Sequence, residues 1–228
     1  MKKNTPAQSN RYPVLLAGAV GLGAYALFLR PRQLRWGATL AEANQTLPGD
    51  DLVPVPNFRT TRAITIQAPP ARVWPWILQI GYQRGGFYSY DTLERLAGLV
   101  DLRSTNKIVP DWQAISAGEA VLISPVTPLD VVIMEPERAF VLHTVMNPFT
   151  AERAEPQSGS AYMNWSWAFI LAPVGAASTR LLIRVRAELQ PRLLATAPAW
   201  LVLEPLHFLM ERKMLQGIKT RAEAGPVY

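Results

Sequence analysis

The chain has 228 residues and a mass of 25.3 kDa, with 49% hydrophobic residues, a formal net charge of +6 and a pI near 9.8. This length and apolar content predict one full-sized domain with a sizeable core. The absence of cysteine excludes disulfides, thiolate nucleophiles and cysteine-based zinc sites. No motif predicts a metal site or a cofactor, and no basic run interleaved with aromatic residues predicts nucleic-acid binding.

The N-terminal region contains one long apolar segment. Residues 1–12 form a short polar start, and residues 13–29 carry no charged side chain. As a helix at about 1.5 Å per residue, this segment is roughly 25 Å long, slightly less than the roughly 30 Å of a membrane core. We therefore predict one transmembrane helix and a single-pass membrane protein. The cluster of Arg30, Arg32 and Arg35 favours a cytoplasmic domain, and a cleaved secretory signal is the alternative.

Residues 30–59 contain several prolines and no sustained periodicity, so they predict a linker or an extended strap. We place the folded domain at residues 60–224 and a short tail at 225–228. Residues 61–67 alternate like a strand, and Pro69-Pro70 then open a helix that ends near Gly81. A glycine-containing loop follows, after which Asp91 is well placed to cap a short helix.

The second half of the domain reads as a run of strands followed by a helix. Strands are predicted at 119–123, 129–135, 139–146, 163–171 and 179–189. The last two form a hairpin, in which we expect Trp167 opposite Ile183 and Trp165 opposite Val185. The C-terminal helix then carries Leu206, Met210, Met214 and Ile218 on one face. This order predicts an α+β domain.

The two faces of the predicted hairpin differ in character. Large apolar residues at Met163, Trp165, Trp167, Phe169 and Leu171 build a broad wall on one face. On the opposite face, Arg180, Arg184 and Arg186 are expected to face solvent, with contact to anionic headgroups as the alternative.

The sequence resembles the START-like, or SRPBCC, superfamily of helix-grip proteins. The resemblance rests on TRAITIQAPPARVWPWILQIG at 61–81, on NWSWAFILAP with TRLLIRVRAEL, and on EPLHFLMERKMLQGIK at 204–219, and it covers nearly all of 60–223. It implies a curved antiparallel sheet wrapped around the long C-terminal helix, with a hydrophobic cavity between them. The stretch RGGFYSYD at 84–91 resembles a membrane-anchored branch, and the superfamily has no shared catalytic set.

The leading interpretation is a membrane-anchored protein that binds a hydrophobic small molecule or a lipid in this cavity. Its predicted ligand-binding residues share the apolar wall and the facing helix: Trp165, Trp167, Ile183, Val185, Met210 and Met214. Simple core packing is the alternative for all of them.

A second interpretation is a cyclase- or dehydratase-type enzyme acting on an apolar carbonyl compound. Arg84, Tyr88 or Tyr90 would polarise the carbonyl, and Glu204 or His207 would move protons. The alternative for residues 84–91 is a structural loop. A third interpretation is a non-catalytic interaction module whose core is filled by its own side chains.

Overall fold

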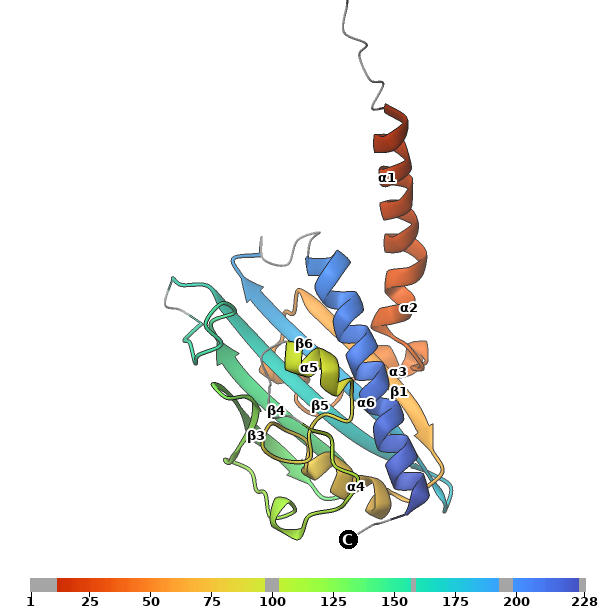
Figure 1. Ribbon diagram of the computed structural model, residues 1–228, viewed down its shortest axis with the longest axis vertical. Helices are drawn as coiled ribbons and strands as arrows, with labels where there is room; N and C mark the ends of the chain where they lie inside the picture. The colour runs from red at the N-terminus through yellow and green to blue at the C-terminus, as the bar shows by residue number, and fades with distance from the viewer. Residues whose placement is uncertain (1–11, 97–102, 157–158, 193–198, 226–228) are drawn as a thin grey trace, which may run out of the picture. The chain divides into compact units, whose positions relative to one another are not determined.

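The computed structural model describes residues 12–96, 103–156, 159–192 and 199–225 (Figure 1). The chain divides into two compact units, Met1–Gln33 and Leu34–Tyr228. The described part of the first unit is helical. It contains α1 (Tyr12–Ala24), the π-helix η1 (Tyr25–Leu29) and the start of α2 (Arg30–Leu34).

The predicted localisation as a single-pass membrane protein needs correction. Among the described residues, none of the helices combines the length and the apolar character that crossing a membrane requires. The single-pass localisation is therefore contradicted.

The second unit is built on an antiparallel sheet of six strands in the order β1-β6-β5-β4-β3-β2. The strands are β1 (Phe58–Ile66), β2 (Ala120–Ser124), β3 (Thr127–Glu135), β4 (Ala139–Met146), β5 (Tyr162–Val174) and β6 (Ser178–Gln190). This sheet and the C-terminal helix confirm the predicted α+β class.

Helices α4 (Pro70–Leu78), α5 (Asp91–Leu96) and α6 (Glu204–Ala224) lie on one face of the sheet (Figure 1). Two further short elements of this unit are the 3-10 turn η3 (Pro110–Trp112) and the π-helix η5 (Ala199–Leu203). The main core lies between this inner face and the helices. It joins Trp167, Phe169 and Ile183 of the hairpin to Trp76 of α4 and Ile218 of α6.

The β5–β6 hairpin has the predicted faces but a different register. Trp165 pairs with Ala187, Trp167 with Val185 and Phe169 with Ile183. The strands continue to a tight turn between Val174 and Ser178, whereas the predicted strands left a longer connection at residues 172–178. The pairing therefore shifts by two residues. A shift of two keeps every side chain on its face, so the predicted wall survives while its predicted pairs do not.

The outer face of the sheet is covered by residues 34–57, which we call the strap. The strap contains α3 (Leu40–Asn44) and η2 (Asp50–Leu52), and a capping box between Thr39 and Glu42 starts α3. Its Leu47 is buried against outer-face side chains such as Val141. Both faces of the sheet are thus covered by the chain itself.

The prediction that Arg180, Arg184 and Arg186 face solvent is wrong. Arg184 is 1% exposed, and its guanidinium donates to the Asp50 carboxylate at 2.6 Å and to three carbonyls of the strap. Arg180 pairs with Glu42 at 2.7 Å, and Arg186 donates to the Val53 carbonyl at 2.9 Å. Arg184 and Arg186 are buried, and Arg180 is partly buried, because the strap supplies acceptors and opposite charges.

Candidate functional site

A cavity of about 200 Å³ lies between the inner face of the sheet and α6. Its lining is Phe87, Ser89, Glu94, Ile123, Trp165, Trp167, His207, Met210, Glu211 and Met214. Most of the surface is apolar, and the polar groups come from α5, α6 and the loop before α5. A mostly apolar concavity with a few inward polar groups is the usual form of a small-molecule site.

The apolar wall follows directly from the alternation along β5. Trp165 and Trp167 are two residues apart, so they share the inner face, and their rings stack with centroids 6.0 Å apart. Phe87 packs against Trp167 at 6.4 Å. From the opposite side, Met210 and Met214 project from successive turns of α6. Their flexible thioethers can adapt to ligands of different shapes.

One end of the cavity carries a buried charge pair and a histidine. Arg62 of β1 is fully buried and donates to the carboxylate of Glu211 on α6. The same guanidinium lies 3.1 Å from Nδ1 of His207. Because an arginine can only donate, Nδ1 accepts and the ring proton resides on Nε2, which lies 3.8 Å from Oε1 of Glu211.

This arrangement favours a neutral His207. The surrounding protein solvates an imidazolium poorly, which lowers the His207 pKa, and Arg62 lowers it further while Glu211 opposes the shift. The pKa is lowered although about a third of the side chain remains exposed. His207 is therefore neutral at physiological pH.

Glu94 of α5 is the unusual group in the cavity. It is fully buried, yet neither carboxylate oxygen has a hydrogen-bond partner among the described residues. Burial, with a smaller contribution from the charge of Asp91, raises the pKa of Glu94 to about 7. The side chain is thus balanced between acid and carboxylate near neutral pH, which is the condition for proton exchange.

The loop before α5 contributes two side chains to the cavity lining. Phe87 and Ser89 line the cavity, while Tyr88 between them is buried against Trp76. The backbone of Tyr88 has φ 55°, and its amide donates to the Ser104 hydroxyl at 2.9 Å. That hydroxyl donates to Asp91 at 2.9 Å. The Asp91 carboxylate therefore fixes the loop through Ser104, a role different from the predicted helix cap.

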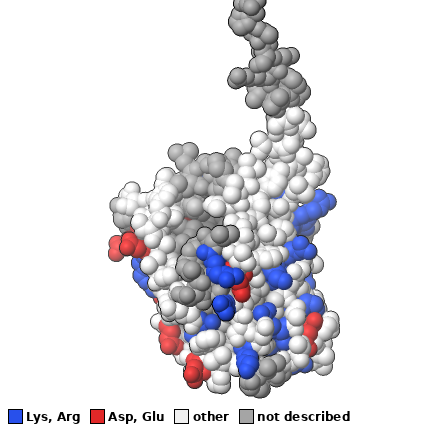
Figure 2. Space-filling view, viewed as in Figure 1, with Lys and Arg blue, Asp and Glu red and all other residues white. Residues whose placement is uncertain are grey.

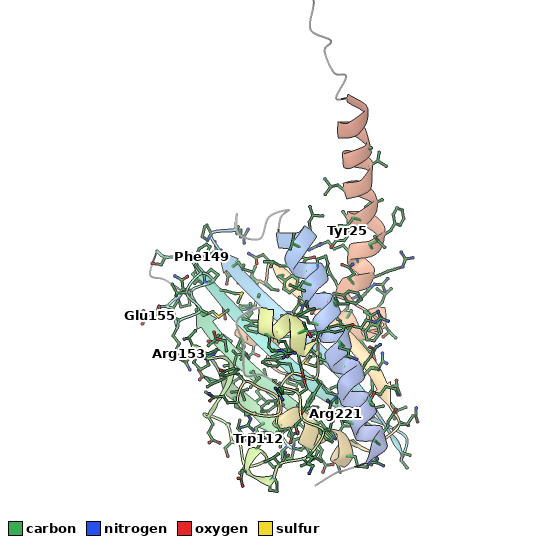
Figure 3. All side chains as sticks on the ribbon, in the orientation of Figure 1. Tyr25, Trp112, Phe149, Arg153, Glu155 and Arg221 are labelled. Carbon is green, nitrogen blue, oxygen red and sulfur yellow. The ribbon has the colours of Figure 1, made fainter. Side chains whose placement is uncertain are left out.

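A close approach of α6 also fixes this loop. At Gly217, an added Cβ would collide with the backbone carbonyl and Cβ of Tyr88. Arg221, one turn further along α6 (Figure 3), lies 4.6 Å above the Tyr88 ring. Glycine at position 217 thus allows α6 to pack directly on the loop that carries Phe87 and Ser89.

The structure brings together four of the six predicted ligand-binding residues. Trp165, Trp167, Met210 and Met214 line the cavity. Ile183 and Val185 are buried in the core and do not belong to the lining.

The predicted catalytic candidates are dispersed, and only His207 lines the cavity. Arg84 donates to the backbone carbonyls of Leu78 and Trp112, and Tyr88 is buried between α4 and α6. Tyr90 is 38% exposed beside Lys213, and Glu204 is buried outside the cavity lining.

Sequence reasoning missed Glu94 and Glu211. Both occupy helices rich in charged residues, where an acid normally faces solvent. The available signal was that Glu211 lies one residue after Met210 and one turn after His207, so the apolar face of α6 already bordered it.

A second, polar hollow of about 790 Å³ lies along the other side of α6, beside residues 88–92. Figure 2 shows Lys and Arg side chains gathered on this face. Those in the hollow already have partners: Lys219 pairs with Glu223, Lys213 lies over the Tyr90 ring, and Arg221 donates to the Thr105 carbonyl.

Within the described residues, no three His, Asp or Glu side chains are grouped to hold a metal ion.

Comparisons with known proteins give similarity only to solved structures. No protein-family model matches the chain, and no curated protein sequence matches it. Norcoclaurine synthase from Thalictrum flavum is 14% identical over 72% of this chain and 93% of that chain, with a TM-score of 0.37. CalU16 from Micromonospora echinospora is 14% identical over 73% and 85%, with a TM-score of 0.31.

A third similar structure, a protein from Mesorhizobium loti, is 12% identical over 75% of this chain and 100% of that chain, with a TM-score of 0.41. None of these structures concerns the membrane-anchored branch of the resemblance. At such identities and scores, the similarities carry no inference about ligand or activity.

Proposed function

We propose that the protein binds a small, mostly apolar molecule in the cavity between β5 and α6. The observation that carries this proposal is the apolar lining itself, a stacked tryptophan pair facing two methionines across about 200 Å³ of space. Pockets that bind drug-sized ligands have volumes of roughly 300–1,000 Å³. The volume therefore favours a compact ligand over a two-chain lipid.

The lining supports a ligand site better than a filled core. A void among apolar side chains forfeits contact energy, so folded proteins keep few of them. Here the void is bordered by side chains with unpaired polar atoms, among them Nε1 of Trp167 and Oγ of Ser89, neither bonded to any described residue. Buried polar atoms are normally hydrogen-bonded, so packing alone does not explain unpaired ones on side chains of the cavity lining. An interaction module with a filled core is accordingly not favoured.

The test is to close the cavity without unfolding the protein. Met210→Trp places a large ring into the cavity, whereas Leu209→Trp adds the same ring at a neighbouring position that is 41% exposed. Full-length protein and both variants are titrated with cyclohexylmethanol by calorimetry, and each variant is checked by thermal unfolding. We expect Met210→Trp to lose binding and Leu209→Trp to retain it. Equal binding by both folded variants would contradict the proposal.

Glu94 favours a second candidate function, an enzyme acting on an apolar carbonyl compound. A buried acid with a pKa of about 7 is suited to general acid–base catalysis in an apolar cavity. His207 lines the same cavity, whereas Arg84, Tyr88 and Tyr90 lie outside it. For any substrate found, we expect Glu94→Gln to abolish turnover and Glu94→Asp to retain part of it. Full turnover by Glu94→Gln would exclude this role.

A further inference from the structure

The unpaired polar atoms of the cavity are mostly hydrogen-bond acceptors. Both oxygens of Glu94 and Oε1 of Glu211 lack a partner among the described residues. The indole N–H of Trp167 is an unpaired donor, and the unpaired Ser89 hydroxyl can donate or accept a hydrogen bond. A complementary ligand therefore offers N–H or O–H groups more than carbonyl oxygens.

The charges around Glu94 are equally one-sided. Asp91 lies on the same helix, and α6 contributes Glu211 and the neutral His207. The positive charge of Arg62, on β1, is already engaged by Glu211. The described cavity lining from β2, β5 and the loop before α5 contains no Lys or Arg. Glu94 is thus a buried acid for which the lining supplies no counter-charge.

We propose that the ligand is an apolar amine whose protonated nitrogen binds the carboxylate of Glu94, with its apolar body against the tryptophan wall. This inference rests on the proposed ligand-binding function and specifies its chemistry. A cation supplies both the missing charge and the missing donors, whereas a carbonyl compound would leave at least the Glu211 oxygen unpaired.

Charge pairing of this kind makes binding depend on pH. Glu94 must be ionised to hold the ammonium group, so amine affinity rises as the pH increases from 6.5 to 8.5, through its pKa of about 7. An alkylamine stays protonated across this range, its pKa being about 10 like that of lysine. The His207 pKa lies below its usual value, so His207 is largely neutral throughout the range.

The experiment compares two probes of nearly the same shape, cyclohexylmethylamine and cyclohexylmethanol. Both are titrated by calorimetry into full-length protein, Glu94→Gln, and Glu152→Gln, which removes an exposed acid as a control. At pH 8 we expect the amine to bind the native protein about tenfold more tightly than the alcohol, as one charge-assisted hydrogen bond provides. Glu94→Gln should remove this preference and its pH dependence, so that the amine and the alcohol bind this variant with similar affinity. Glu152→Gln should behave like the native protein.

The outcomes separate the two proposals. If neither probe binds, the proposed ligand-binding function fails and the inference fails with it. If the alcohol binds as tightly as the amine, the cavity binds apolar molecules and the amine assignment alone is overturned. A preference for the amine that persists in Glu94→Gln would overturn the role of Glu94.

Discussion

Replacing Glu94 by glutamine should make the protein more stable, and increasingly so as the pH rises. Glu94 is fully buried without a hydrogen-bond partner among the described residues, and its pKa is raised from 4.5 to about 7. The folded state therefore holds this proton more tightly than the unfolded state. The resulting stabilisation is complete below about pH 4.5, declines as the pH rises to 7, and is absent above it.

The size of the effect follows from the shift. About 2.5 pKa units at 1.36 kcal/mol each give roughly 3 kcal/mol as an upper bound. Water entering the cavity screens the charge, so we expect about half of this, roughly 1.5 kcal/mol. Glutamine carries no charge at any pH. The stability difference between Glu94→Gln and the native protein should therefore grow by that amount between pH 5 and pH 8.

Urea unfolding followed by circular dichroism at several pH values measures this difference. Subtracting the native curve cancels the titration of groups that both proteins share, including His207 and Glu42. Glu152→Gln, at an exposed position, should show no such growth. A difference that stays flat, or that shrinks from pH 5 to pH 8, would refute the reasoning about Glu94.

Three further changes test the contacts under the strap and the packing of α6 on the loop before α5. Arg184→Met should lower the free energy of unfolding by about 3–5 kcal/mol, because it removes the closer of the two arginine partners of Asp50 and the donors to three strap carbonyls. Urea unfolding measures this, and a loss below about 1 kcal/mol would contradict it. Glu42→Gln should cost about 1 kcal/mol at pH 6 and nothing near pH 2, because its arginine partner lowers the Glu42 pKa to about 2 and the side chain is partly exposed. Gly217→Ala should destabilise the protein by about 1–3 kcal/mol and weaken probe binding, since the added methyl collides with the loop that lines the cavity. Gly18→Ala, also in a helix but with nothing nearby, should be neutral or stabilising.

The inner face of the sheet could be predicted from the sequence because alternation records which side of a strand is buried. Trp165, Trp167 and Phe169 occupy every second position, and they line the cavity or the core as expected. The pairing between strands depends instead on where the turn closes. The chain turns between Val174 and Ser178, whereas the first of the two predicted strands ended at residue 171.

The outer face could not be predicted by the same reasoning. Alternation identifies Arg180 and Arg184 as polar positions but does not show what they contact. Their partners, Glu42 and Asp50, lie more than 100 residues earlier in a proline-containing segment without periodicity. Sequence alone predicts that a polar strand face is exposed to solvent, unless the segment that covers it and supplies opposite charges is known. Glu94 was missed for a related reason, because the cavity that it lines is formed with residues of β5 and α6, and its own short helix carries no sign of them.

The pairing of acids with arginines in this fold supports the proposed location of the ligand site. Asp50 is matched by Arg184 under the strap, and Glu211 is matched by Arg62 beside the cavity. Glu94, as fully buried as either arginine, receives no such partner from the described residues. Leaving a buried acid unpaired costs stability that an apolar side chain would have kept. Sequences depart from their own pairing rule mainly where function requires it. A ligand that supplies the absent donor and charge would recover that stability, so the protein should be most stable with its cavity filled by a cation.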